Sequence, residues 1–201
     1  MTSRGRPRDT TLDEAIDAAT ESVLLQDGYP AISIDRIARM AGTTRAAVYR
    51  RVRSPSELVV RLATSRFGVD PAPCNDDLRT DLRQLQQLQR EFFADPVTRA
   101  ALAGLLTGIG TDEALAALFH ERFIAPRRAS VVAMLDRAAA RGEIAPVERP
   151  ELISDLLTGP LLLRTVVPAI GAIDDAIIEA TVEAALNQCR TRSAAPDGPR
   201  S

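Results

Sequence analysis

The sequence of 201 residues contains no lysine, no tryptophan and one histidine. All 25 basic residues are therefore arginine, which codon bias in a GC-rich genome explains, and any phosphate contact must be made by a guanidinium group. Aromatic residues make up only 3% of the chain, whereas alanine and aliphatic residues are abundant. This composition disfavours a β-sandwich and predicts an all-α fold of packed helices.

Residues suited to catalysis or metal binding are scarce. His120 is the only histidine and is expected at the surface or a helix end, and Cys74 and Cys189 do not have a metal-ligand spacing. The sequence shows no phosphate-binding loop and no evident nucleophile beside a base. We therefore expect no enzyme activity, no catalytic or metal-binding residues and no cofactor. An α-helical enzyme with an incidental basic surface is the alternative.

Long apolar runs are also missing. The longest, around Leu161 to Ile173, is interrupted by Arg164 and Pro168, which indicates a buried helix and not a membrane span. The polar opening MTSRGRPRDT lacks the apolar segment of a secretory signal. Because the two cysteines are far apart as well, we expect a reduced, cytoplasmic protein with no membrane partner.

Charge is unevenly distributed along the chain. Residues 1–66 hold 11 arginines and 8 acids, a net charge of +3, whereas residues 67–201 hold 14 arginines and 19 acids, a net charge of −5. Six arginines and no acid lie between Arg36 and Ser56. A solvated helix face is one explanation of this segment, and docking on a polyanion is the other.

Capping signals and helical periodicity predict two helices before the glycine at position 42. A first helix should begin at Thr11, because Thr11-Leu12-Asp13-Glu14 has the pattern of a capping box, and should stop at Gly28. Ser33 should cap a short second helix. Gly42 ends this helix, since glycine can adopt the left-handed conformation that a sharp turn needs.

Two further helices are expected after this turn. Thr43 or Thr44 caps a third helix from Arg45 to about Val52, and Ser54-Pro55-Ser56-Glu57 has the residues that open a fourth. Short helices joined by a tight glycine turn match the helix-turn-helix plan of DNA-binding proteins. A solvated surface is the alternative, but the capping threonines and the absence of acids favour a face that meets nucleic acid.

The segment ISIDRIARMAGTTRAAVYRRVRSPSELV resembles the DNA-binding domain of TetR-family transcriptional repressors. The shared pattern is a small residue, I-A-x-x-A-G, a recognition helix that ends in tyrosine, and S-x-x-x-L. Three positions depart from it: Pro55 replaces a common lysine, Val52 a common aromatic residue and Ala46 a frequent glycine. The resemblance implies a nine-helix homodimer with a ligand pocket in each body, and Pro55 implies that one phosphate contact is lost or reduced to backbone amides.

The resemblance also implies two sets of DNA contacts. Base edges would be approached by Arg45, Ala46, Tyr49 and Arg50, and phosphates would be held by Ser33, Thr44, Tyr49, Arg51 and Arg53. Arginine forks suit guanine edges, whereas hydroxyl groups position the helix without reading sequence. Ahead of this head, Arg4, Arg6 and Arg8 form a basic arm suited to a minor groove, or simply a soluble tail.

The body is expected to be a helical bundle. The predicted divisions are a flexible basic arm at 1–10, a helix-turn-helix head at 11–67 with its fourth helix leading to the body, a ligand-binding and dimerisation domain at 76–190, and a disordered tail at 191–201. Pro126 should kink or restart the third helix of the body, and the fourth should bend near Gly159-Pro160. About nine helices are therefore expected in all.

The last two helices are apolar around more of their circumference than one buried face requires. They either lie centrally in a monomer or form a four-helix bundle across a two-fold axis, and the resemblance favours the homodimer. It also implies an apolar pocket, whose candidate residues would otherwise be plain core. These are Leu85, Leu88, Phe92, Leu102, Phe119, Phe123, Met134, Leu157, Leu161 and Arg164, of which Arg164 would pair either with an anionic ligand or with a neighbouring acid.

The sequence therefore predicts a ligand-responsive, sequence-specific DNA-binding transcriptional repressor. Its expected partners are a palindromic operator, a second copy of itself and an unknown small-molecule effector. A non-specific DNA-packaging protein is a further alternative. It is disfavoured because the positive charge is confined to one end of an acidic chain.

Overall fold

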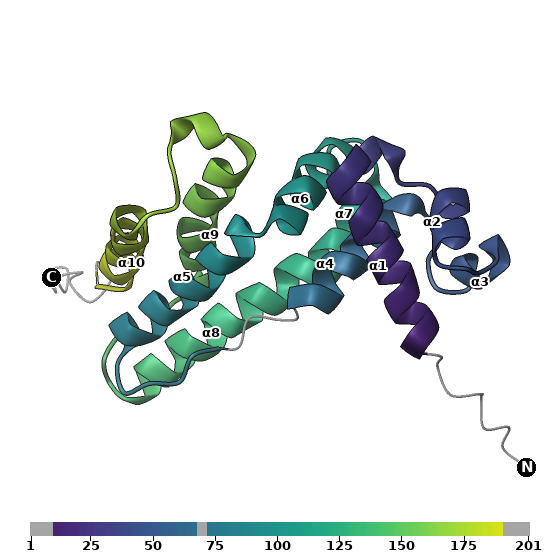
Figure 1. Ribbon diagram of the computed structural model, residues 1–201. Helices are drawn as coiled ribbons and strands as arrows, with labels where there is room; N and C mark the ends of the chain where they lie inside the picture. The colour runs from purple at the N-terminus through teal and green to yellow at the C-terminus, as the bar shows by residue number, and fades with distance from the viewer. Residues whose placement is uncertain (1–9, 68–71, 191–201) are drawn as a thin grey trace, which may run out of the picture. The chain divides into compact units, whose positions relative to one another are not determined.

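A computed structural model describes residues 10–67 and 72–190, and all regular structure in these ranges is helical (Figure 1). The α-helices are α1 Thr10–Asp27, α2 Ile34–Met40, α3 Arg45–Tyr49, α4 Pro55–Phe67, α5 Leu78–Ala94, α6 Pro96–Ile109, α7 Glu113–Phe119, α8 Ala125–Ala140, α9 Pro150–Val166 and α10 Asp175–Arg190. Two 3₁₀ turns, η1 Tyr29–Ala31 and η3 Pro168–Ile170, and a π-helical turn, η2 His120–Ile124, complete the elements. The expected all-α fold is confirmed.

The π-helical turn lies where a break was expected. Helices α7, η2 and α8 follow one another without a gap, so they form one helical run and the described chain has the expected nine helical segments. Pro126 is the second residue of α8. It has no amide hydrogen to donate to the carbonyl four residues earlier, and the π-helical turn is the local adjustment that precedes it. The predicted break at Pro126, a kink or a restart, is therefore present as a π-helical turn inside one helical run.

Two predicted boundaries differ from the structure. Helix α1 begins at Thr10, so Thr11 lies inside the helix and is not its cap. Helix α3 ends at Tyr49 instead of Val52. Val52 follows this turn, and its side chain is almost fully buried, as is that of Val48. Helix α9 continues through Pro160 without interruption.

The chain forms two compact units. The first, called the head, comprises the described residues up to Arg66 together with Ala100–Phe119. The second, called the body, comprises the described residues of Phe67–Arg99 and those from His120 onward. Most of α6 and all of α7 pack with the head, so the head is larger than the predicted 11–67, and the predicted ligand-binding and dimerisation domain at 76–190 stays a prediction. The predicted arm at 1–10, apart from Thr10, and the tail at 191–201 lie outside the described residues.

A close contact in the head explains why α6 belongs to it. A Cβ atom placed on Gly104 would lie 2.0 Å from Cγ of Tyr29, so only glycine allows the Tyr29 side chain to come this close to the helix. The Tyr29 hydroxyl group donates a hydrogen bond to Ser56 Oγ at 2.9 Å. Tyr29 therefore connects η1, α4 and α6 within one unit.

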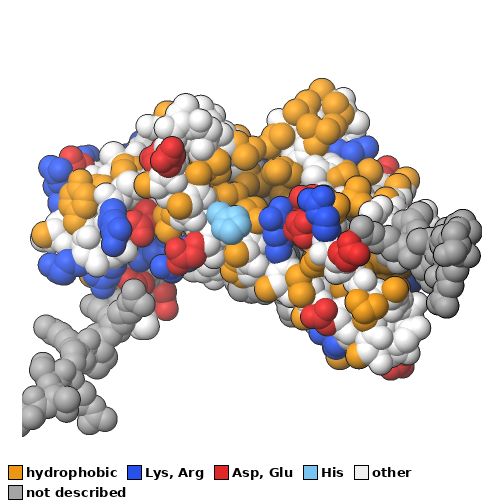
Figure 2. Space-filling view, turned by 180° about the vertical axis from the view of Figure 1, so that it is seen from behind, with side chains coloured by type: hydrophobic (Ala, Val, Ile, Leu, Met, Phe, Trp, Pro, Cys, Tyr) orange, Lys and Arg blue, Asp and Glu red, His pale blue; other side chains and the backbone are white. Residues whose placement is uncertain are grey.

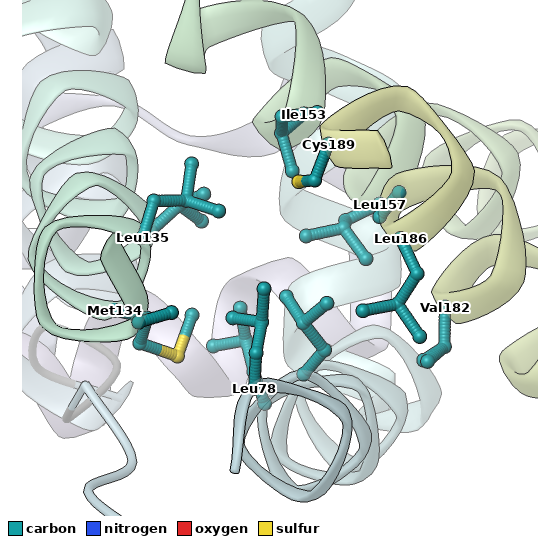
Figure 3. Close-up of a cluster of buried hydrophobic side chains, with 13 residues drawn as sticks. Leu78, Met134, Leu135, Ile153, Leu157, Val182, Leu186 and Cys189 are labelled. Carbon is teal, nitrogen blue, oxygen red and sulfur yellow. The ribbon is translucent and has the colours of Figure 1, made fainter. Parts of the chain in front are cut away.

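The core of the body lies between α5, α8, α9 and α10 (Figure 3). Its buried side chains include Leu78, Met134, Leu135, Ile153, Leu157, Val182 and Leu186. At the surface, α5 and α10 are joined by three ion pairs, Arg79–Glu183, Arg83–Glu179 and Arg90–Asp175. The hydrogen bond from Arg83 holds the pKa of Glu179 below its usual value. No helix in the described ranges is long and apolar enough to cross a membrane.

Gly104→Ala is expected to lower the free energy of unfolding by about 1–3 kcal/mol, because the added methyl group overlaps the Tyr29 ring. Urea denaturation measures this change. Gly110→Ala is the control, since a Cβ atom there meets nothing within 4 Å, and it should alter stability by less than about 0.5 kcal/mol. Adding Tyr29→Ala to Gly104→Ala should cost less than the sum of the two single changes. Equal stability of the two glycine variants would contradict the contact.

Candidate nucleic-acid interface

Side-chain hydroxyl groups cap the first turns of both α2 and α3 by accepting hydrogen bonds from backbone N–H groups. Ser33 Oγ accepts a hydrogen bond from the backbone N–H of Arg36 at 3.3 Å, and Thr44 Oγ1 accepts one from that of Ala47 at 3.1 Å. Gly42 between them has a φ of +63°, which glycine adopts without strain. The predicted caps and turn are confirmed, and of the two threonines it is Thr44 that caps α3.

Helix α3 has one buried face and one exposed face. Ala47 and Val48 are buried against the rest of the head. The exposed residues are Thr44, Arg45, Ala46, Tyr49 and Arg50, and half of the Tyr49 surface is accessible. Five of the predicted contact residues therefore share one surface, called the α3 face below.

The α3 face is rich in arginine (Figure 2). Arg45 Nε lies 2.6 Å from Asp35 Oδ1, but both side chains are more than half exposed, so this ion pair is weak and can be exchanged for a phosphate or a base. Arg39, Arg50 and Arg53 are exposed as well, and none of their guanidinium groups pairs with an acid of the described residues. Arg39 was missing from the predicted contacts, although it belongs to the same acid-free run.

Arg51 does not belong to this exposed surface. Its guanidinium group forms an ion pair with Asp13 of α1 and donates to the Ala47 carbonyl at 3.1 Å, and its side chain is only 14% exposed. Arg61 of α4 reaches the same acid and also Asp17, at 2.6 Å. Arg51 therefore ties the end of α3 to α1, and its predicted phosphate contact stays a prediction that this pairing does not favour.

The other predicted contacts keep groups that suit phosphate. Ser33 Oγ accepts a hydrogen bond from the backbone N–H of Arg36 at the start of α2, and its own O–H group can still donate to a phosphate. The backbone N–H of Arg53 donates to Glu57 Oε2 at 2.6 Å, and Glu57 N–H donates to Ser54 Oγ, so Ser54 caps α4 as predicted. Arg4, Arg6 and Arg8 lie outside the described residues.

The body contains a small aromatic hollow that brings together two of the predicted ligand residues, Phe92 and Phe123. Their ring centres are 5.4 Å apart, and the Arg127 guanidinium group lies over both, 4.9 Å from Phe92 and 3.8 Å from Phe123. Buried Gln89 and Ser154 complete a hollow of about 50 Å³. Arg127 was missed because a buried arginine has no sequence pattern of its own.

The remaining predicted ligand residues are dispersed. Leu85, Met134 and Leu157 lie in the core of the body, Leu161 is fully buried, Leu88 is half-buried, and Leu102 and Phe119 belong to the head. Arg164 lines a second hollow. No group of three or more potential metal ligands occurs in the part of the chain that the structure describes.

Comparisons with known proteins agree with this geometry. The family described as "Bacterial regulatory proteins, tetR family" matches residues 16–62, and "Tetracyclin repressor-like, C-terminal domain" matches residues 72–185. The chain is 30% identical over 190 residues to "DNA-binding transcriptional repressor TetR" of Mycobacteroides abscessus, covering 91% of this chain and 94% of that protein. It is 28% identical over 172 residues to the uncharacterized HTH-type transcriptional regulator YdeS of Bacillus subtilis, covering 83% and 84%.

A solved structure shows the same fold. The crystal structure of the TetR family transcription regulator SCO0332 matches with a TM-score of 0.70 and 25% identity. The match covers 88% of this chain and 97% of that one. The likeness therefore extends over both the head and the body.

Arg50→Ala and Arg51→Ala are expected to act differently, although the residues are adjacent. Arg50→Ala should weaken DNA binding without changing stability, because its side chain is exposed. Arg51→Ala should lower the free energy of unfolding by about 1–2 kcal/mol, because it leaves Asp13 with one arginine partner fewer. Urea denaturation and fluorescence-anisotropy titration with DNA separate the two effects. If Arg51→Ala instead lowers the affinity for DNA and leaves stability unchanged, Arg51 is a DNA contact.

Proposed function

Because this chain belongs to the TetR family of DNA-binding transcriptional repressors, we propose that it acts as a homodimer on a palindromic operator and leaves the DNA when a small effector binds the body. The observation that carries the proposal is the α3 face. A helix with five exposed contact residues is fixed by a side-chain cap at its start and by the Arg51–Asp13 pair at its end. Such a surface enters DNA without reorganising.

Recognition would divide between bases and phosphates. Arg45 and Arg50 present guanidinium forks to guanine edges in the major groove, where each good pair contributes about 1–3 kcal/mol of discrimination. Ala46 and Tyr49 would approach base edges as well. Tyr49, Thr44, Ser33 and Arg53 supply hydroxyl and guanidinium donors to phosphates.

The homodimer is supported by an apolar stripe on α9. Leu152, Leu156, Leu163, Val166 and Val167 follow the three- and four-residue spacing of one helix face, and Ile170 of η3 extends it. From Leu156 onward each of these side chains is more than a third exposed, and Figure 2 shows hydrophobic side chains gathered over η3. Covering this stripe with the same stripe of a second copy gives a four-helix bundle of α9 and α10. Two heads at a fixed separation then match two half-sites.

Effector response would be a shift between two states of the protein. The effector must bind the state that releases DNA more tightly than the state that binds it. The aromatic hollow of Phe92, Phe123 and Arg127 is one end of the candidate site. Repression is supported by the name of the M. abscessus relative, a DNA-binding transcriptional repressor.

The function is tested by anisotropy titration with DNA that flanks the protein's own gene, against scrambled DNA at the same salt concentration. We expect a preference of roughly 10³-fold or more for one palindromic fragment. Arg45→Ala and Tyr49→Ala should weaken that preference without changing stability. Equal binding of both DNAs would favour a packaging protein, and no binding to any genomic fragment at low salt would contradict the proposal.

Leu163→Glu is expected to convert the dimer into monomers, because it places a charge in the centre of the proposed α9 interface. Sedimentation velocity measures the oligomeric state, and operator affinity should fall by about tenfold or more once the heads are separate. Leu25→Glu is the matched control, since Leu25 is an equally exposed leucine of α1. A Leu163→Glu protein that stays dimeric would place the interface elsewhere.

A further inference from the structure

The second hollow of the body is lined by three arginines from three helices. Arg90 comes from α5, Arg99 from the first turn of α6 and Arg164 from the last turn of α9. The hollow has a volume of about 390 Å³, which lies within the range of small-molecule sites in proteins and far exceeds that of the aromatic hollow. It lies wholly within the body.

The charge of this hollow is not neutralised. Arg90 Nη1 lies 2.6 Å from Asp175 Oδ1, but Arg99 and Arg164 have no acidic partner in residues 10–67 and 72–190. Elsewhere on the body, Arg79, Arg83, Arg122, Arg128, Arg141 and Arg149 each pair with a carboxylate. The sequence predicted that Arg164 pairs either with an anionic ligand or with a neighbouring acid, and the described residues provide no such acid. Three guanidinium groups and one acid leave the hollow positive, and this favours an anion.

The walls of the hollow are apolar. Phe93, Ala94, Pro168, Ala172 and Ile173 line it between the arginines. Phe93 also lines the aromatic hollow of Phe92 and Phe123, so one buried ring forms a wall of both. A ligand held at the arginines by its head group can therefore place an apolar chain against Phe93.

We propose that this hollow binds the anionic head group of an amphipathic small molecule whose apolar chain lies against Phe93. The head group is a carboxylate or a phosphate, both of which accept the paired hydrogen bonds of a guanidinium fork. Arg99 and Arg164 are its main donors, and Arg90 supports them while it keeps Asp175. The claim that this molecule is the effector rests on the proposed function. Binding of the molecule at the hollow does not, because it is measured without DNA.

Isothermal titration of the full chain with octyl phosphate, octanoate, ethyl phosphate and octanol tests the site. Octyl phosphate or octanoate should bind, and the comparison of the two identifies the preferred head group. Octanol should not bind measurably, because it has no charge. Ethyl phosphate should bind at least about tenfold more weakly than octyl phosphate, because it buries less apolar surface.

Arg164→Gln and Arg99→Gln should each weaken binding of the octyl anion by about tenfold or more. Arg122→Gln is the charge-matched control, since Arg122 is an exposed arginine that pairs with the adjacent Glu121 and lines neither hollow. Its affinity should equal that of the unmodified protein. Loss of affinity in all three variants alike, or in none, would overturn the site.

Two other outcomes would also contradict the proposal. If octanol binds as tightly as the octyl anions, the arginines do not select the ligand. If no anion binds and Arg164→Gln shifts the monomer–dimer equilibrium in sedimentation, a carboxylate of the second copy occupies the hollow. An operator-release assay with the same ligands separates the proposed binding site from the proposed effector role. If binding depends on the arginines but does not release DNA, the hollow is a binding site and its ligand is not the effector.

Discussion

The α3 face depends on the charged cluster around Asp13. This acid of α1 pairs with Arg51, just beyond α3, and with Arg61 of α4, so three segments of the head meet at one carboxylate. The side chains concerned are mostly shielded from solvent, and such pairs are screened by salt much less than the exposed pair of Arg45 with Asp35. Salt that weakens DNA contacts will therefore leave the surface that makes them intact.

The arginines of this chain fall into two classes that composition cannot distinguish. Those with carboxylate partners, such as Arg61 and Arg83, join helices and determine the fold. Among the described residues, Arg39, Arg50 and Arg53 have no acidic partner and lie on or near the α3 face, and Arg99 and Arg164 have none and line one hollow of the body. Because an arginine without an acid gains most from an external anion, these two places are where DNA and a ligand would interact.

Local signals in the sequence predicted local structure correctly. Ser33, Gly42 and Thr44 act within three residues of themselves, and each has its predicted role. The fate of Arg51 was not predictable in this way, because its partner lies 38 residues earlier. The attachment of α6 to the head depends on Gly104 meeting Tyr29, a tertiary contact that no periodicity records. The ion pairs between α5 and α10 likewise join residues that are 85 to 104 positions apart in the sequence. Which arginines have no acidic partner could therefore be seen only in the structure.

Helix α6 belongs partly to each of the two compact units. Its first turn, with Arg99, belongs to the body, and the rest, with Gly104, belongs to the head. The ligand proposed for the hollow of Arg99 and Arg164 would contact this first turn. The other end holds the Tyr29 ring, whose hydroxyl group bonds Ser56 at the start of α4. Because a Cβ atom at position 104 would overlap the Tyr29 ring, this part of α6 cannot move past η1 within the head without displacing that ring.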